Sequence, residues 1–288
     1  MPNPLPFRRV AILGTGLIGG SFALALRKHF PGVSIVGFDR AGAANPALAG
    51  GAIDQIAPDL PAAIPGADLV YIALPIGAAL DALPLIAAAA EPHTLVTDAC
   101  STKAEICKIA TGHFRGGVRF LGGHPMAGKE HSGFQNADAE LFRGAPYALI
   151  GAEQDPDPRV KAFADILAAI DARPVWCDAE THDWAVGIVS HVPQLVSIAL
   201  ARVVQDETDE TGLPVSLAGP GLQDTLRLAG SPYSVWRDIL FSNTENISRA
   251  LDRMSQAIDY LRAQLTSKGM EEEFANANAV YSSLRKPK

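Results

Sequence analysis

Short apolar runs alternate with segments of helical periodicity over the first 178 residues of the chain. The apolar runs predict buried strands because they are short and end in turn residues. They are Val10 to Leu13, Leu69 to Leu74, Thr94 to Asp98, Arg119 to Leu121, Pro146 to Ile150 and Pro174 to Cys177. Helical segments such as 102–110 and 160–170 lie between them, and Thr102 and Glu105 have the spacing of a capping box. This alternation predicts an α/β fold with an N-terminal Rossmann-type, doubly wound parallel sheet.

Strand signals stop after about Ala179, and helical patterns continue almost to the end of the chain. The sequence therefore predicts two domains, residues 1–178 and an all-helical domain of residues 179–288. In the second domain a seam repeats at steps of four and three, as in a coiled coil, at Leu240, Thr244, Ile247, Leu251, Met254, Ile258, Leu261 and Leu265. The seam either packs against neighbouring helices of the same chain or forms a dimer interface. In an interlocked dimer it can do both. Residues 266–288 are expected to form a short helix and a polar tail.

A dinucleotide-binding pattern follows the first predicted strand. Gly14 allows a tight turn, Gly16 lets a pyrophosphate approach the backbone, and Gly19 lets the next helix pack closely. Asp39 ends a second strand and is placed to bind a ribose hydroxyl, which favours NAD, while Arg40 could accommodate the 2'-phosphate of NADP. The residues expected to line the cofactor are Gly14, Gly16, Leu17, Ile18, Gly19, Asp39, Arg40, Leu74, Pro75 and Ser101.

His124 is the candidate catalytic base. It is flanked by Gly122, Gly123 and Pro125 in a predicted turn at a strand end, where a ligand can come close to the backbone. A structural histidine in a turn is the alternative. Beside a nicotinamide, a neutral histidine with a pKa near its ordinary value of about 6.5 can accept a hydroxyl proton, so activity is expected to fall at low pH.

Two polar features of the helical domain are candidates for substrate binding. One face of the helix predicted from 182 to 204 carries Asp183, Gly187, Ser190 and Gln194. Buried polar groups need partners, so this face meets either a ligand or the polar groups of another helix. Farther on, Asp224 and Arg227 form either a surface ion pair or, through Arg227, a site for a substrate carboxylate.

Composition excludes several classes of protein. The chain has 288 residues, 48% of them hydrophobic, and a net charge of −7, with no dense Lys/Arg run to bind nucleic acid. Three cysteines without Cys-x-x-Cys spacing indicate free thiols in a reducing compartment and no metal site. The apolar stretch 69–90 contains Pro75, Asp81 and Pro84, so it is not expected to span a membrane. A cytoplasmic protein is expected.

Several motifs in a fixed order resemble the prephenate and arogenate dehydrogenases of tyrosine biosynthesis, which oxidise and decarboxylate a cyclohexadienyl substrate. The resemblance covers nearly the whole chain. It is carried by Gly14 to Gly20, Asp98-Ala-Cys-Ser-Thr-Lys, Gly123-His-Pro-Met-Ala-Gly-Lys-Glu, His182-Asp183, Ser190-His191-Val-Pro, Asp224 to Arg227 and Trp236-Arg-Asp.

The resemblance implies roles for individual residues and a homodimer built through the helical domain. His124 would be the catalytic base, Ser101 would orient this histidine and the nicotinamide, and Arg227 would bind the side-chain carboxylate. Glu130, Asp183 and Arg227 match an ionic network that gates the pocket. The remaining residues expected to bind substrate are Ser190, His191, Gln194 and Trp236.

Two positions depart from the family pattern. Gln194 stands where prephenate-preferring members usually carry histidine, and a neutral amide would not repel the ammonium of arogenate, so arogenate is expected to be the better substrate. Pro220 replaces a glycine, which puts in doubt any backbone contact there. The alternative functions are a beta-hydroxyacid dehydrogenase, which would need a catalytic lysine on a helix, and a non-catalytic dinucleotide sensor.

Overall fold

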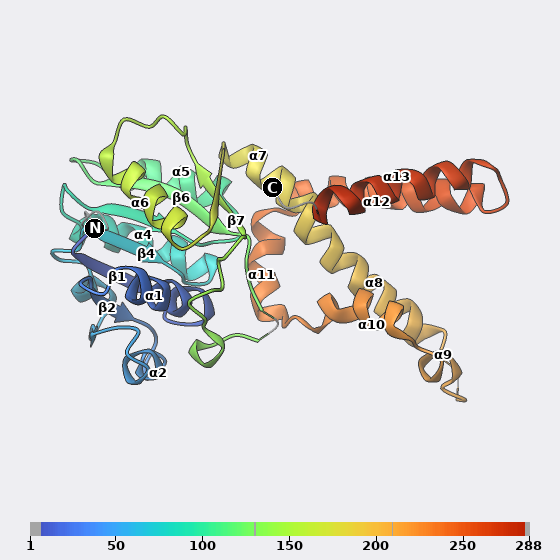
Figure 1. Ribbon diagram of the computed structural model, residues 1–288, viewed down its shortest axis with the longest axis horizontal. Coiled ribbons are helices and arrows are strands. Elements are labelled where there is room, and N and C mark those ends of the chain that lie inside the picture. Colours follow the sequence, from blue (N-terminus) through green and yellow to red (C-terminus); the bar gives the residue numbers. More distant parts are fainter. Residues whose placement is uncertain (1–6, 130, 209, 286–288) are drawn as a thin grey trace.

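The computed structural model describes residues 7–129, 131–208 and 210–285, and it divides them between a sheet domain and a set of projecting helices (Figure 1). One eight-stranded sheet has the order β3-β2-β1-β4-β5-β6-β7-β8. Its strands are β1 (Arg9–Leu13), β2 (Ser34–Phe38), β3 (Gln55–Ile56), β4 (Leu69–Ile72), β5 (Leu95–Asp98), β6 (Arg119–Pro125), β7 (Pro146–Ile150) and β8 (Arg173–Cys177). The strands β1 to β6 are parallel, which confirms the Rossmann-type sheet.

The sheet is not parallel throughout. Strand β7 runs antiparallel to β6, with His124 opposite Ala148, and β8 runs parallel to β7. A parallel neighbour needs a crossover connection, usually a helix. Residues 126–145 instead double back, and the described part of this loop contains the 3₁₀ turn η1 (Phe134–Asn136). The prediction of a uniformly parallel sheet was therefore wrong for the last two strands, and the two-residue strand β3 was not predicted.

Helices cover both faces of the sheet, and each face has its own apolar core. One core surrounds Phe22, Tyr71 and Phe163, while the other contains Ile72 and Leu83. The helices of this domain are α1 (Leu17–His29), α2 (Asn45–Ala49), α3 (Leu60–Ala63), α4 (Ile76–Ala89), α5 (Ala104–His113) and α6 (Pro158–Ala169). Two rigid layers around one sheet fix the strand ends, from which the candidate site is built.

The rest of the described chain is helical, as predicted. Two arms leave the sheet domain: α8 to α10 form one and the hairpin of α12 and α13 forms the other, with α11 lying between them and the sheet (Figure 1). The elements are α7 (Ala179–Val186), the π turn η2 (Gly187–His191), α8 (Val192–Asp206), α9 (Leu213–Ser216), α10 (Pro220–Leu226), the 3₁₀ turn η3 (Arg227–Gly230), α11 (Tyr233–Ser242), α12 (Thr244–Gln264) and α13 (Gly269–Arg285).

Two helix predictions need correction. The helix expected from 182 to 204 runs from 179 to 206 and changes phase at η2, where the Val192 N–H donates to the Gly187 carbonyl five residues back. Pro193 has no N–H to continue the normal ladder, which accounts for a π turn at this place. The seam predicted from Leu240 is broken at Asn243, which has non-helical backbone angles and separates α11 from α12. The C-terminal helix α13 is also longer than the short helix predicted.

The stretch Ala179–Asp206 is, among the described residues, the one helix long and apolar enough to cross a membrane. It also carries the buried polar side chains of His182, Asp183 and Gln194. Buried polar groups are costly in a bilayer, so this composition fits the central helix of a domain better than a membrane span.

Candidate active site

The glycine loop after β1 has the shape that a dinucleotide requires. Gly14 has a φ of 92°, and a Cβ there would overlap the Ala73 carbonyl, whereas a Cβ on Gly19 would overlap the Gly14 carbonyl. A Cβ on Gly16 would meet open space. Helix α1 begins at Leu17 without a side-chain cap, so the N–H groups of its first turn, which includes Ile18, can bind a phosphate.

Asp39 lies directly against this loop. One carboxylate oxygen, Oδ2, accepts from the Thr15 N–H at 2.8 Å and from the Thr15 hydroxyl at 3.2 Å. The other oxygen accepts from the Arg40 N–H at 2.8 Å and keeps capacity for a further donor such as a ribose hydroxyl. The Arg40 side chain is exposed, and Leu74 and Pro75 follow β4 just before α4.

His124 is held by a second histidine. It is the next-to-last residue of β6, so it lies in a strand and not in the predicted turn, and it is only 8% exposed. Its Nδ1 is 2.9 Å from the Nε2 of His182, and the Nδ1 of His182 is 2.8 Å from the Oδ1 of Asp183. The two rings meet edge to face, with centroids 5.1 Å apart. The described residues contain no hydrogen-bond partner for the Nε2 of His124.

Asp183 joins the two domains. Its oxygens accept from the backbone N–H groups of Lys103 at 2.7 Å and Ala104 at 2.9 Å, where α5 begins. A buried carboxylate at a helix N-terminus is stabilised by unpaired N–H groups and by the helix dipole. Asp183 therefore caps α5, whereas the predicted capping box of Thr102 is absent because the Thr102 hydroxyl bonds to that of Ser242 at 2.8 Å.

Lys103 fixes the backbone next to His124. Its ammonium, fully buried, pairs with the buried carboxylate of Asp98 and donates to the Gly123 carbonyl at 2.7 Å. Asp98 in turn accepts from the Gly123 N–H at 3.1 Å and from the Cys100 N–H at 2.9 Å. The pair ties the ends of β5 and β6 to the start of α5.

Burial lowers the pKa of His124 well below its ordinary value, and the nearby His182, Lys103 and His191 lower it further. The neutral imidazole is the form that a general base needs. The expected loss of activity toward low pH keeps its direction, and the lowered pKa places it below the ordinary histidine range.

A second polar cluster lies around His191, which is 1% exposed. Its ring meets Trp236 edge to face at 5.8 Å, and its Nδ1 is 3.2 Å from the Nδ2 of Asn243. Burial lowers the pKa of His191 to about 4. Gln194 is buried one turn away, and its amide nitrogen has no partner among the described residues, whereas Ser190 is half-buried.

The other predicted site residues lie on neighbouring segments. Ser101 lies in a bend after β5, and His182 bonds to the Nδ1 of His124. Arg227 begins η3, which is anchored to α8 because the Ser197 hydroxyl donates to Thr225 and accepts from Ala229. Glu130 lies outside the described residues. The carboxylate of Asp183 accepts from His182 and from the first backbone N–H groups of α5, so its position is that of an anchor for the histidines.

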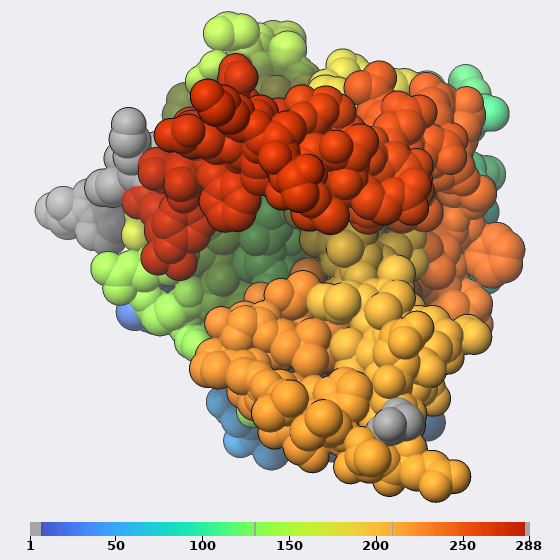
Figure 2. Space-filling view, turned by 90° about the vertical axis from the view of Figure 1, so that its right-hand side faces the viewer, coloured from blue at the N-terminus to red at the C-terminus, as the bar shows by residue number. Residues whose placement is uncertain are grey.

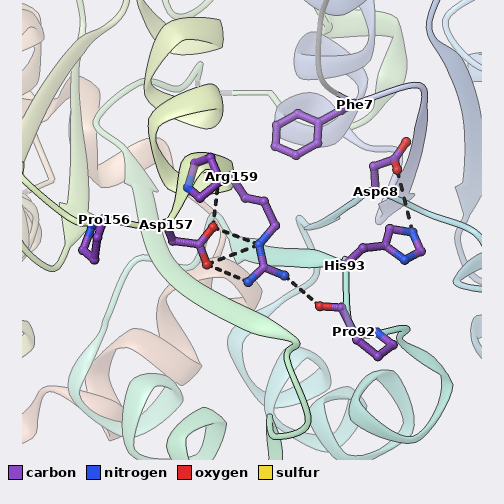
Figure 3. A pocket seen from close by; sticks show the side chains of 8 residues that line it. Phe7, Asp68, Pro92, His93, Pro156, Asp157 and Arg159 are labelled. Carbon is purple, nitrogen blue, oxygen red and sulfur yellow. Dashed lines mark hydrogen bonds and ion pairs between the residues drawn. The ribbon is translucent and has the colours of Figure 1, made fainter.

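A hollow of about 640 Å³ lies elsewhere (Figure 3). Phe7, Asp68 and His93 line it near the amino-terminal ends of β1, β4 and β5, and Arg159 beside them is occupied by Asp157 and by the Pro92 carbonyl. Ligands of such sheets bind outside the carboxyl ends of the strands, where His124 and the glycine loop lie. This hollow therefore lies at the opposite edge of the sheet from the candidate active site.

Comparisons with known proteins agree with this geometry. Residues 22–176 match a family model for the nucleotide-binding domain of prephenate dehydrogenase, and residues 178–277 match one for its dimerization domain. The chain belongs to the prephenate dehydrogenase family. It is therefore an oxidoreductase, and the family reaction is an oxidative decarboxylation.

Individual relatives have the same overall structure. A prephenate dehydrogenase from Lactococcus lactis is 34% identical over 96% of this chain and 77% of its own length. A prephenate dehydrogenase from Aquifex aeolicus, solved with hydroxyphenyl propionate and NAD+, has a TM-score of 0.87 at 26% identity and covers 98% of both chains. An arogenate dehydrogenase from Synechocystis has a TM-score of 0.78 at 28% identity, covering 96% of this chain and 98% of its own.

Four residues of the site were not predicted from the sequence of this family member: Asp98, Lys103, His182 and Asn243. The first three stand in motifs that carried the family resemblance, yet nothing local assigns them a partner. His182 and His124 are 58 residues apart, so only the packing of α7 against β6 and α5 brings the rings together. Asn243 had no sequence signal.

We expect replacement of Lys103 by Met to lower the free energy of unfolding by about 3–5 kcal/mol, because it leaves Asp98 as an unpaired buried charge. Urea denaturation at neutral pH measures this loss. The exposed Lys108 on the same helix is the matched control, and its replacement by Met should change stability by less than about 0.5 kcal/mol. Equal effects of the two changes would contradict the role given to the buried pair.

Proposed function

We propose that this protein transfers hydride from a cyclohexadienyl acid, prephenate or arogenate, to NAD, with His124 as the base that accepts the ring hydroxyl proton. The observation that carries the proposal is the hydrogen-bonded chain from His124 through His182 to Asp183. A sensor of dinucleotides has no need for a buried neutral histidine with one free ring nitrogen at the carboxyl end of a strand.

The chain of hydrogen bonds fixes the tautomers of both histidines. The Asp183 carboxylate accepts, so the Nδ1 of His182 donates and its Nε2 is free to accept. The Nδ1 of His124 then donates to this Nε2, which leaves the Nε2 of His124 with a lone pair for the substrate hydroxyl. Asp183 also stabilises the positive charge that the histidine pair gains when it takes the proton.

The described residues fit a bound dinucleotide. Gly14, Gly16 and the uncapped start of α1 can hold the pyrophosphate, and Asp39 can bind the adenine ribose. The nicotinamide supplies the hydride acceptor, which none of the amino-acid side chains can replace. Asp39 disfavours a 2'-phosphate, so NAD should be preferred over NADP, with Arg40 allowing some use of NADP.

In the decarboxylation step the protein binds and orients the substrate. Loss of hydride from the carbinol carbon gives a dienone, and expulsion of carbon dioxide then makes the ring aromatic. We assign the side-chain carboxylate of the substrate to Arg227 and its neighbouring amino or keto group to Gln194. The amide of Gln194 is buried and carries no charge, so it would not repel the ammonium of arogenate, which supports arogenate as the better substrate.

We also propose a homodimer built through the helical domain. Large apolar side chains are exposed on both arms, including Val203 at 56% and Leu217 at 74% on one arm and Phe274 at 67% on the other. The molecule is hollowed between these arms, with α13 above and α9 and α10 below (Figure 2). A single chain rarely leaves so much apolar surface in contact with water, and a second copy would cover it.

Purified protein should form reduced cofactor when mixed with NAD and either acid. Arogenate and prephenate, each with NAD and NADP, are compared in one assay, where we expect the highest kcat/KM with arogenate and NAD. The His124→Asn variant should lose at least about 10²-fold in kcat, because a general base contributes 10²–10⁴-fold, and should still bind NADH. Folded protein that binds NADH but turns over neither acid would overturn the proposal.

The Asp183→Asn variant tests the hydrogen-bonded chain. The carboxylate accepts from His182, Lys103 and Ala104, and an amide has only one accepting oxygen. The variant therefore loses acceptor capacity and the negative charge that stabilises the protonated histidine pair, so kcat should fall about 10³-fold with little change in KM. The exposed Glu180 on the same helix is the control, and Glu180→Gln should keep kcat within about twofold. A loss of kcat below tenfold in Asp183→Asn would show that this carboxylate does not support His124 as the base.

Sedimentation equilibrium should give a molecular mass twice the 30.3 kDa of the chain at micromolar concentration. Replacing Phe274 by Glu places a charge on the exposed arm and should weaken association. The exposed Phe241, on α11, is the control for an apolar side chain outside the arms. A monomer at all concentrations would rule out the dimer.

A further inference from the structure

We infer that Asn243 is a positioning residue that holds His191 as a neutral donor, with its proton on Nε2. The site would then pair two histidines of opposite tautomer: His124 with a bare Nε2 that accepts, and His191 with an Nε2–H that donates. This inference rests on the proposed function in one respect, because it assumes that the free nitrogen of His191 faces the substrate.

The orientation of the Asn243 amide is fixed by its surroundings. Its Nδ2 is 2.7 Å from the backbone carbonyl of Asp183, which can only accept. Its Oδ1 accepts from the Nδ2 of Asn246 at 2.8 Å. The side chain is 3% exposed, so exchanging its oxygen and nitrogen would place two acceptors against each other without water to separate them.

The second proton on Nδ2 then points to the Nδ1 of His191, 3.2 Å away. A nitrogen that accepts this bond cannot carry a proton, so the proton of the neutral ring is on Nε2. The described residues contain no partner for this Nε2–H. The ring lies close enough to His124 to lower the pKa of His124.

The groups that face His191 keep it neutral or nearly so across the physiological range. Burial, the largest effect, and the neighbouring His182 lower its pKa, while Asp183 raises it, and the result is about 4. His124 on β6 is the other titratable neighbour, and Trp236 on α11 covers one side of the ring without charge. A donor that does not titrate between about pH 5 and 9 suits an acceptor atom on the substrate, such as a carboxylate or carbonyl oxygen.

The deciding measurement is a long-range ¹⁵N–¹H correlation spectrum of the histidine rings, which distinguishes a proton on Nδ1 from one on Nε2. The spectrum of His191→Gln assigns the signal of His191. In the unmodified protein we expect the Nε2–H form of His191 from pH 5 to 9, and a proton on its Nδ1 would overturn the inference. The tautomer of His124 in the same spectrum tests the proposed function separately.

Variants test whether Asn243 is the cause. Asn243→Ala should give a mixture of His191 tautomers and weaken binding of hydroxyphenyl propionate about fivefold, as expected for one hydrogen bond. Asn246→Ala removes a neighbour but leaves both donor bonds of Asn243, so it should keep the Nε2–H form and the affinity. NADH binding reports that each variant is folded. If Asn243→Ala kept the Nε2–H form alone, Asn243 would not be the residue that positions His191.

Discussion

The Asp183 carboxylate, buried at the amino end of α5, is the interaction on which the site depends. It belongs to the first helix of the helical domain, yet two of its hydrogen bonds go to backbone N–H groups of the sheet domain. Its third goes to His182, and through that ring to His124. A buried charge is costly unless donors surround it, so the domains must keep their relative position for the carboxylate to stay satisfied. The same contact therefore connects the domain geometry to the tautomer that we propose for His124.

The polar groups around this carboxylate are arranged so that almost every donor meets an acceptor. Lys103 contributes its backbone N–H to Asp183 and its ammonium to Asp98, which connects the anchor of the histidines to the strand that carries His124. Asn243 joins Asp183 to His191 from the other side, at the break between α11 and α12. Among the described residues, the second nitrogens of His124 and His191 and the amide nitrogen of Gln194 have no protein hydrogen-bond partner, and we assign them to the substrate. In a low-dielectric site such atoms select a ligand that satisfies them.

The first helices of the helical domain carry two histidines of the candidate site. Helices α7 and α8 form one long rod with a π turn at Gly187–His191. His182 lies before the turn and bonds to His124, and His191 is the last residue of the turn and bonds to Asn243. The remaining length of α8, with α9 and α10, leads away from the site and exposes apolar surface. One helix thus joins the candidate active site to the surface that we assign to dimerisation.

Local patterns in the sequence determined the elements and the cofactor loop. The apolar runs gave the strands near their observed positions, and the glycine spacing identified a loop in which positive φ and close backbone contacts leave no room for a side chain. These properties depend on residues within a few positions of one another. His124 and the family motifs also stood out, because several short motifs in order are specific even when their contacts are unknown.

Tertiary structure alone decided the direction of β7 and β8, the tautomers, and the partners of the charged groups. The spacing of Thr102 and Glu105 predicted that Thr102 caps α5, but packing brings Asp183 to α5 and leaves the Thr102 hydroxyl to Ser242. Likewise, the pKa of His124 is lowered by burial and by neighbours from distant elements. Hydrogen-bond partners and desolvation depend on groups far apart in the chain, so periodicity and spacing cannot supply them.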